Sequence, residues 1–452
     1  MTPVRLFGGA AVLVLAFGCG GGSSHPAAGT GGTDEGGQGG TATGGKTGSG
    51  GKGGAGASGT GGAPQRLDSG AADAEQPTSA DAAGDTAAPG DGAAVPAAGL
   101  GPWTGKDNVP PSPNPPGGLA PAQVPMFVSL GFDDNPYSEG MNWAVSAFSA
   151  VTNPPGKGNA ATFDGTPARA TFYHSSTYTA AAGSWKAAYN AGFETGDHTV
   201  HHYHGSTADM GMNFSEAGWT KEIQGCIDYL TGGAVGVKRA EVWGFRTPFL
   251  QYNANVFPAV KALDFWYDCS IEEGHQEDQD GTNYLWPYTL DHGSPGNATH
   301  PRLTPITTWP AGLWEMPAYR VIVPPDADAA KYGVPAGLRA KLRILRPNGV
   351  GIAQGKITGL DYNLWYDYNL NKAEFVATLK YTLDTRLRGN RAPLLFGMHS
   401  AIYTGQEATV NASLAERKAA IVEFLNYAVK QADVRIVTTK AVLDWIRNPV
   451  PL

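Results

Sequence analysis

The sequence has little cysteine, little charge and only a short apolar run at its N-terminus. Of its three cysteines, only Cys226 and Cys269 fall in the part expected to fold, where they either form one disulfide or remain as two buried thiols. Charged residues make up 16% of the chain, and the formal net charge is -8. Because the folded part contains no basic run, we expect no nucleic acid partner.

The N-terminus has the features of an export signal. A single arginine precedes the apolar run 6–17, which is too short to cross a bilayer and is soon followed by Cys19. The segment Leu15-Ala16-Phe17-Gly18-Cys19 resembles the cleavage site of bacterial lipoproteins, in which the cysteine becomes the lipidated first residue. We therefore expect residues 1–18 to be a signal peptide and Cys19 to carry a lipid anchor. The alternative is an ordinary secretory signal that is cut near residue 18.

A long low-complexity stretch follows the N-terminal signal. From residue 20 to about residue 100 the chain consists largely of Gly, Ala, Ser, Thr and Asp, which cannot bury enough apolar surface to offset the entropy of folding. The proline-rich run 110–116 favours a stiffer, extended conformation. We expect a disordered linker over residues 20–121 and one folded, monomeric domain over residues 122–452.

Polar residues follow successive apolar strands in this folded part. The run 124–132 predicts a buried strand that ends at Asp133 and Asp134. A second strand at 168–173 and a helix at 185–191 precede a third strand, which ends at His198. Because this order is typical of a parallel α/β sheet or barrel, we expect one site assembled from strand ends.

Each candidate residue also has a structural explanation. The aspartate pair forms a turn or a helix cap in the structural explanation. In the functional explanation, one carboxylate binds a cation while the other accepts a proton. His198 and His202 are four residues apart, a spacing that puts both rings on one face of a helical turn, within reach of a shared metal ion. The alternative is a solvated turn, and the nearby His201 and His204 leave the ligand register open.

Arg246 stands at the end of another apolar stretch, 242–245. An arginine in this place can orient a carboxylate through a bidentate contact and tune its basicity. A surface arginine that lies beside an aromatic cluster is the alternative.

These segments together resemble the motifs of the polysaccharide deacetylases, the NodB-homology group also called carbohydrate esterase family 4. The resemblance runs in order from residue 124 to residue 449, and its later segments are most similar to the chitin-deacetylase-like branch. It implies an α/β fold consisting of a single distorted (β/α) barrel. The matching segments are Phe132-Asp133-Asp134, His198-Thr199-Val200-His201-His202, Arg246-Thr247-Pro248-Phe249 and the stretches 263–271, 285–291, 313–317 and 390–400, the last of which contains His399.

The resemblance also implies a catalytic metal centre. Members of this family hold one divalent metal ion, usually zinc, with one aspartate and two histidines. Carried over to this sequence, the ligands are Asp134, His198 and His202, which settles the register in favour of this histidine pair. Three protein ligands leave positions open for water and substrate, as a catalytic site requires.

The remaining roles follow from the same resemblance. Asp133 is expected to be the general base that takes a proton from the attacking water, oriented by Arg246. His399 is expected to be the general acid that protonates the departing amine. The backbone N–H of Phe249 is expected to stabilise the oxyanion, and Trp314 to line the acetyl pocket.

Two glycines depart from the family pattern, and one partner is undefined. Gly131 replaces the usual threonine of the first motif and is expected to reshape the strand end. Gly397 replaces the usual leucine two residues before the histidine of the last motif, which puts the pocket wall in question. The family pairs its acid histidine with an aspartate, for which Asp361 and Asp367 are the candidates.

The expected function is hydrolysis of N-acetyl groups on a carbohydrate polymer such as a chitin-like or peptidoglycan-like glycan. O-deacetylation of acetylated xylan or a similar polysaccharide, with the same residues, is the nearest alternative. A carbohydrate-binding module that has lost turnover is the alternative from another class of protein. The expected partner is an acetylated polysaccharide. We expect membrane contact only through the lipid on Cys19, and a location in the periplasm or at the cell surface.

Overall fold

The computed structural model describes residues 99–206, 213–407 and 411–452. The expected signal peptide, the lipidation site at Cys19 and most of the expected linker lie outside the described residues. Within the described ranges, none of the helices combines the length and the apolar character needed to cross a membrane.

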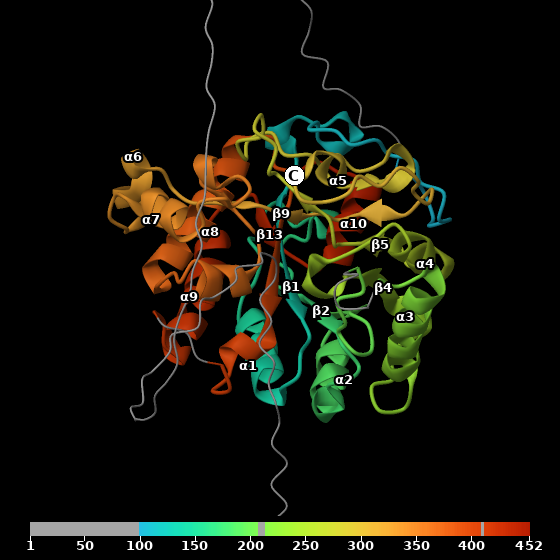
Figure 1. The fold of residues 1–452 in the computed structure, drawn as a ribbon. Coiled ribbons are helices and arrows are strands. Elements are labelled where there is room, and N and C mark those ends of the chain that lie inside the picture. Colours follow the sequence, from blue (N-terminus) through green and yellow to red (C-terminus); the bar gives the residue numbers. More distant parts are fainter. Residues whose placement is uncertain (1–98, 207–212, 408–410) are drawn as a thin grey trace, which may run out of the picture. The chain divides into compact units, whose positions relative to one another are not determined.

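The centre of the fold is a nine-stranded sheet with the order β12-β1-β2-β3-β4-β5-β8-β7, in which β13 also pairs with β1 (Figure 1). Its neighbouring strands are parallel except for β7 and β8. The strands are β1 (Met126–Asp133), β2 (Thr171–His174), β3 (Glu194–Asp197), β4 (Val242–Phe245), β5 (Tyr267–Asp268), β7 (Tyr288–Thr289), β8 (Trp314–Glu315), β12 (Leu394–His399) and β13 (Val434–Ile436). Short strands β6 (Glu272–Glu273) and β9 (Ala318–Tyr319) pair in parallel, and β10 (Val321–Ile322) and β11 (Lys356–Ile357) pair antiparallel.

Helices follow most of the parallel strands and flank the sheet. Figure 1 shows α1, α2 and α3 beside strands β1, β2 and β4, while α8 packs along α9. The helices are α1 (Ser138–Ser149), α2 (Ala182–Asn190), α3 (Glu216–Thr231), α4 (Val256–Ala262), α5 (Pro295–Thr299), α6 (Asp326–Ala329), α7 (Leu338–Leu345), α8 (Lys372–Arg388), α9 (Leu414–Ala428) and α10 (Thr439–Arg447).

The side chains of β1 show how the sheet divides the core. Alternate residues of a strand point to opposite faces. Met126, Val128, Leu130 and Phe132 belong to the apolar cluster that includes α1, α2 and α3. Phe127 points the other way, into a second cluster that contains side chains of β2, β5, β8 and α10. The sheet is therefore curled around α10, and the concave side of β1 also carries Asp133 at its carboxyl end.

Several predicted elements are found where the sequence places them: the strands predicted at 124–132 and 168–173 are β1 and β2, and the helix predicted at 185–191 is α2. Helix α10 is capped at its N-terminus by the Thr438 hydroxyl, which accepts a hydrogen bond from the Ala441 N–H at 3.2 Å. Helix α9 begins with a capping box in which Ser413 and Glu416 bond each other's backbone N–H groups. The predicted α/β class with parallel strands is confirmed. Between the described residues no backbone pairing joins the edge strands β7 and β12, so the barrel is distorted and open.

The segment 99–121 differs from the expectation of a disordered linker. Asp107 is buried, and its carboxylate pairs with the Arg447 guanidinium at 2.6 Å and accepts the Trp314 indole N–H at 2.8 Å. The ring of Trp103 stacks on that of Trp266, with centroids 4.5 Å apart. This low-complexity segment packs because a few of its side chains find buried partners, and the folded part therefore begins before residue 122.

Candidate active site

The two adjacent aspartates leave β1 in different directions. Asp133 is the last residue of the strand and is buried on its concave side. Asp134 and Asn135 follow with φ angles of 65° and 59°, a left-handed conformation that is uncommon for residues other than glycine. The Asn135 amide holds this turn by donating to the carbonyl oxygens of Phe132 and Tyr173, both at 3.0 Å. The tight turn separates the carboxylates and lets each face a different partner.

His198 and His202 lie on a loop after β3, and not on a helical turn as their spacing suggested. Thr199 and His202 have φ angles of 69° and 56°, which a right-handed helix excludes. The Asp197 carboxylate accepts the Thr199 N–H at 2.9 Å, and the Thr199 hydroxyl accepts the His202 N–H at 3.2 Å. These local bonds between side chain and backbone fold the loop back on itself and bring the ring centroids of the two histidines to 5.0 Å.

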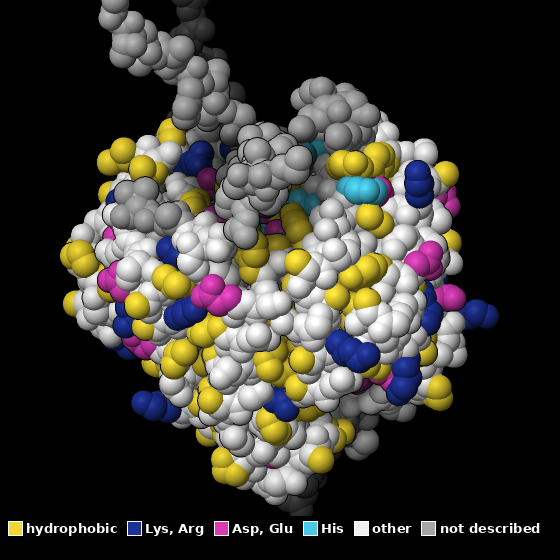
Figure 2. All heavy atoms as spheres, turned by 90° about the horizontal axis from the view of Figure 1, so that it is seen from below, with side chains coloured by type: hydrophobic (Ala, Val, Ile, Leu, Met, Phe, Trp, Pro, Cys, Tyr) yellow, Lys and Arg dark blue, Asp and Glu magenta, His cyan; other side chains and the backbone are white. Residues whose placement is uncertain are grey.

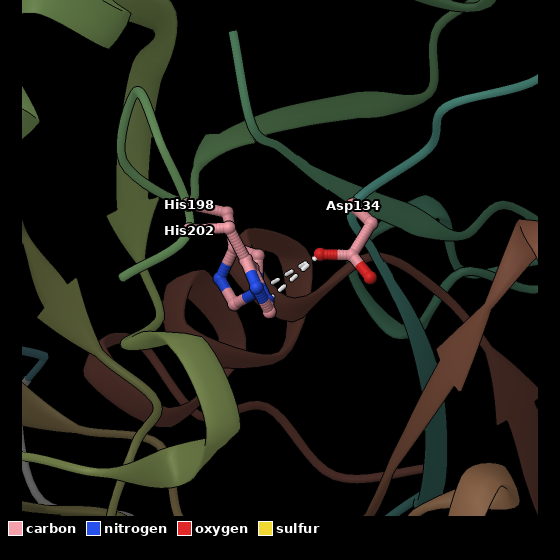
Figure 3. Close-up of side chains that lie close together, drawn as sticks. All are labelled: Asp134, His198 and His202. Atoms are coloured by element: carbon pink, nitrogen blue, oxygen red, sulfur yellow. Dashed lines mark ion pairs between the residues drawn. The ribbon is translucent and has the colours of Figure 1, made fainter. Parts of the chain in front are cut away.

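The loop places both histidines opposite Asp134 (Figure 3). The Nε2 atoms of His198 and His202 lie 3.5 and 3.0 Å from Oδ1 of Asp134. Among the described residues, these three form the one group of histidine, cysteine and acidic side chains whose ligand atoms all lie within 4.8 Å of one another.

The protonation of His198 shows that these residues fit a cation. Its Nδ1 lies 2.7 Å from the carbonyl oxygen of Arg246, which can only accept a hydrogen bond, so Nδ1 carries the proton. Burial lowers the pKa of the His198 imidazole to about 4, so the ring is neutral at pH 7 and Nε2 presents a lone pair to the carboxylate. Oδ1 of Asp134 is buried and accepts no hydrogen bond. A lone pair facing a carboxylate is repulsive unless a cation lies between them, and two imidazoles with one carboxylate suit a divalent metal.

Asp134 is ionised in this environment. Burial alone would raise the pKa of its carboxyl group, but the surrounding charges, that of protonated His399 among them, hold that pKa well below its usual value. The group is therefore a carboxylate, as a metal ligand must be.

Arg246 connects β4 to Asp133. It follows β4 directly, is buried, and its Nη1 donates to Oδ1 of Asp133 at 2.8 Å. The Arg246 guanidinium lies over the ring of Tyr173, with its central carbon 4.4 Å from the ring centroid. The predicted contact between arginine and carboxylate is thus present, and the alternative of a surface arginine does not apply.

His399 pairs with Asp361 and not with Asp367. Its Nδ1 lies 2.8 Å from Oδ1 of Asp361, whose other oxygen accepts the hydroxyl of Tyr403 at 3.0 Å. Asp367 instead pairs with Arg346 at 2.6 Å. Burial opposes protonation of the imidazole, but its hydrogen bond to Asp361 and that carboxylate's charge raise the pKa of His399 to about 9.

The register of the sheet sets the acid and the base side by side. Residue 133 of β1 is the direct partner of residue 399 of β12 in the parallel ladder. Asp133 and His399 therefore end neighbouring strands at the same edge, and the charge of Asp134 also contributes to the raised pKa of His399.

Both unusual glycines accommodate a neighbouring side chain. A Cβ at Gly397 would lie 2.7 Å from Cγ of Leu360, whose segment pairs with β12 and delivers Asp361 to His399. A Cβ at Gly131 would lie 2.9 Å from the ring of Tyr173 and 3.3 Å from the Arg246 guanidinium. These departures from the family pattern thus make room for residues of the site.

Phe249 forms the rim beside His202. It lies in a short 3-10 turn, Pro248–Leu250, with a φ angle of 60°. Its ring stacks on His204 at a centroid distance of 3.7 Å and meets the edge of His202 at 4.4 Å. The role of its backbone N–H in stabilising an oxyanion stays a prediction.

The other histidines of the loop turn elsewhere. His201 is exposed and pairs with Glu222 at 2.9 Å, and His204 bonds Gln251 at 2.9 Å. Histidine side chains gather beside hydrophobic ones on the face drawn in Figure 2. Of the alternatives that spacing left open, the structure brings His198 and His202 to Asp134.

Trp314 does not line this site. Its side chain is completely buried in the cluster around α10, and its indole N–H donates to Asp107. The expected role in an acetyl pocket is therefore corrected to a packing role. Sequence reasoning missed Asn135, for which only its position next to Asp134 was a signal, and it did not foresee the hydrogen bond of Tyr403 to Asp361. Cys226 and Cys269 are both free and buried, so the thiol alternative holds.

Comparisons with known proteins find similar sequences and structures. Chitin deacetylase 8 of Bombyx mori is 27% identical over 348 residues, which cover 75% of this chain and 75% of that protein. A solved structure from Mycobacterium smegmatis, named as a polysaccharide deacetylase, is 13% identical and covers 75% of this chain and 95% of its own, with a TM-score of 0.43.

A family 4 carbohydrate esterase from Streptomyces lividans in complex with acetate is 19% identical, with a TM-score of 0.24. The match covers 32% of this chain and 64% of that one, so this chain spans less than two thirds of its length. No family model matches the sequence. The match to Chitin deacetylase 8 of Bombyx mori over three quarters of both chains, together with the motifs described above, supports a NodB-type polysaccharide deacetylase.

Proposed function

We propose that this protein is a metal-dependent hydrolase that removes N-acetyl groups from a carbohydrate polymer, a chitin-like or peptidoglycan-like glycan. The observation that carries the proposal is the placement of two differently paired groups beside Asp134, His198 and His202. On one side Asp133 meets a guanidinium at 2.8 Å, and on the other His399 meets a carboxylate at 2.8 Å. Hydrolysis of an amide needs one group to take a proton and one to give a proton.

In the proposed reaction, Asp133 accepts a proton as the oxygen of water forms a bond to the acetamide carbon. The Nδ1 atom of His399 bonds Asp361, which keeps the imidazole protonated. His399 then donates the proton on its Nε2 atom to the sugar nitrogen as the carbon–nitrogen bond breaks. The products are acetate and a free amine. We assign to the Phe249 N–H the stabilisation of the negative oxygen, and to Arg246, which donates a hydrogen bond to Asp133, the positioning of that carboxylate.

Asp134, His198 and His202 would hold one divalent metal ion, for which we propose zinc because nitrogen and carboxylate ligands suit it. Such an ion supplies Lewis-acid polarisation of the carbonyl and activation of water. The raised pKa of His399 favours an amine as the leaving group, because an amine departs readily only with a proton.

We further propose that the protein is exported, is cleaved after residue 18 and is a monomer anchored by a lipid on Cys19. The region that would confer these properties lies in residues 1–121 of the sequence. Replacing Cys19 by alanine should release the protein from the membrane fraction, and continued partition with membranes would show that this lipid is not the anchor.

Acetate release by the full chain tests the proposed activity. The substrates are chitin oligomers, peptidoglycan and acetylated xylan, each with chelator and after zinc is restored. We expect zinc-dependent release from an N-acetylated glycan. Release from acetylated xylan alone would establish an O-acetyl esterase, and no release by protein that holds one metal ion per chain would favour a binding module.

A further inference from the structure

A continuous chain of hydrogen bonds runs through the concave side of the sheet from helix α10 towards the active site. The backbone N–H of Lys440 donates to Oε2 of Glu194 at 2.9 Å. The other oxygen of Glu194 accepts the Tyr267 hydroxyl at 2.6 Å. That hydroxyl lies 3.0 Å from the hydroxyl of Tyr173. Each of these side chains is buried, so the chain is held by protein groups alone.

Cys269 joins this chain to the catalytic residues. Its sulfur lies 3.3 Å from the Tyr173 hydroxyl, and it accepts two hydrogen bonds from Arg246, from Nη2 at 2.8 Å and from Nε at 3.1 Å. The opposite edge of the same guanidinium donates from Nη1 to Asp133 at 2.8 Å. The thiol, which is 1% exposed, therefore contacts the edge of Arg246 that does not face the base.

The space around the guanidinium is closed on its other sides. Its plane lies against the ring of Tyr173, and a Cβ at Gly131 would come within 3.3 Å of it. A planar group confined in this way has few positions in which all its N–H groups find acceptors. Without the sulfur, Nη2 would lose its acceptor in a buried place, and Nε would keep only the Cys269 carbonyl oxygen at 3.2 Å.

We propose that Cys269 is a positioning residue for the deacetylation, because its sulfur holds Arg246 at the angle from which it orients and stabilises the Asp133 carboxylate. The inference rests on the proposed function and deepens it. If this is its role, position 269 requires a side chain that accepts hydrogen bonds from Arg246, and the methyl group of an alanine cannot replace the sulfur. An unpaired, buried guanidinium edge would drive Arg246 to a new position and loosen its contact with Asp133.

The test compares Cys269→Ala with Cys269→Ser in the zinc-loaded full chain. We expect Cys269→Ala to lower kcat about tenfold with little change in KM, because the loss concerns the base and not substrate binding. Cys269→Ser, whose hydroxyl still accepts hydrogen bonds, should restore kcat.

Cys226→Ala is the matched control. Cys226 is also a free and buried thiol, but it donates to the His174 carbonyl oxygen and contacts no guanidinium. This variant should keep the wild-type kcat and KM. A wild-type kcat in Cys269→Ala would overturn the proposal, and so would a Cys269→Ser variant as impaired as Cys269→Ala.

A second measurement separates this proposal from the proposed function. The Arg246 Nε–H signal in nitrogen-15 NMR spectra, assigned by its loss in Arg246→Lys, should be protected from hydrogen exchange in the wild type and in Cys269→Ser. In Cys269→Ala it should exchange faster. If the wild type releases no acetate from any glycan, the proposed function fails, whereas equal protection in all three proteins would overturn the positioning role.

Discussion

Replacing Asp361 by asparagine should impair the enzyme in a way that grows with pH. The carboxylate of Asp361 raises the pKa of His399 to about 9, so the imidazole is almost fully protonated at pH 7. An asparagine can still accept the Nδ1–H through its amide oxygen, which preserves the ring's orientation but removes the charge. The pKa of His399 should then fall to about its ordinary value of 6.5, because the contributions that most oppose burial, the hydrogen bond to a charged carboxylate and that charge, are lost.

The size of the effect follows from the fraction of protonated histidine. With a pKa falling from about 9 to about 6.5, that fraction decreases about fourfold at pH 7 and about thirtyfold at pH 8. We therefore expect kcat of Asp361→Asn to approach the wild-type value towards pH 6 and to fall steeply above it.

The assay is acetate release from a chitin oligomer between pH 6 and pH 9, with zinc kept saturating. Asp367→Asn is the control, because Asp367 bonds Arg346 and Asn363 and does not contact His399. A rate deficit of the same size at pH 6 and pH 8 would refute the reasoning, since it would mean that Asp361 acts through structure and not through its charge.

Three further changes test other parts of the structure. Asp133→Asn should abolish turnover while bound zinc remains near one per chain, and loss of zinc would show that Asp133 is a ligand. Gly397→Leu should destabilise the protein by about 2 kcal/mol and lower kcat, because the leucine side chain would collide with Leu360. Gly405 has open space around it, so the control Gly405→Ala should change neither the stability nor kcat. Asp107→Asn should lower the free energy of unfolding by about 3 kcal/mol in urea, because a buried charge partner is lost; a change under about 0.5 kcal/mol would contradict the packing of the segment 99–121.

The sequence located Asp133 and His198 at strand ends because strand ends are strongly marked. A buried apolar run followed by a carboxylate or imidazole fixes both the strand and the edge at which the side chain emerges. Parallel strands then bring Asp133 and His399 to the same edge whatever the length of chain between them. The long-range partner Asp361 could not be chosen in this way, because the local pattern around Asp367 offers a carboxylate of the same kind.

The failed expectations concern features that depend on tertiary contacts. The spacing of His198 and His202 fits a helix, but the Asp197 and Thr199 side chains compete for backbone N–H groups and fold a loop. Composition predicted disorder up to residue 121, yet the pairing of Asp107 with buried groups outweighs the low apolar content around it. A fully buried tryptophan beside a family motif cannot be distinguished from one that lines a pocket without knowing where its indole N–H points.

The loop that replaces the expected helix has a physical consequence for the metal centre. A left-handed residue other than glycine costs about 1 kcal/mol, and Asp134, Thr199, His202 and Phe249 all adopt that conformation at the site. On a helix both imidazoles would approach from one direction. The loop instead fixes His198 from the interior, through the Arg246 carbonyl, while His202 packs against Phe249 at the rim. Because His198 bonds the backbone carbonyl of the residue whose side chain orients Asp133, a backbone shift at Arg246 should disturb His198 and Asp133 together, whereas loss of the Phe249 ring should disturb His202 alone among the three.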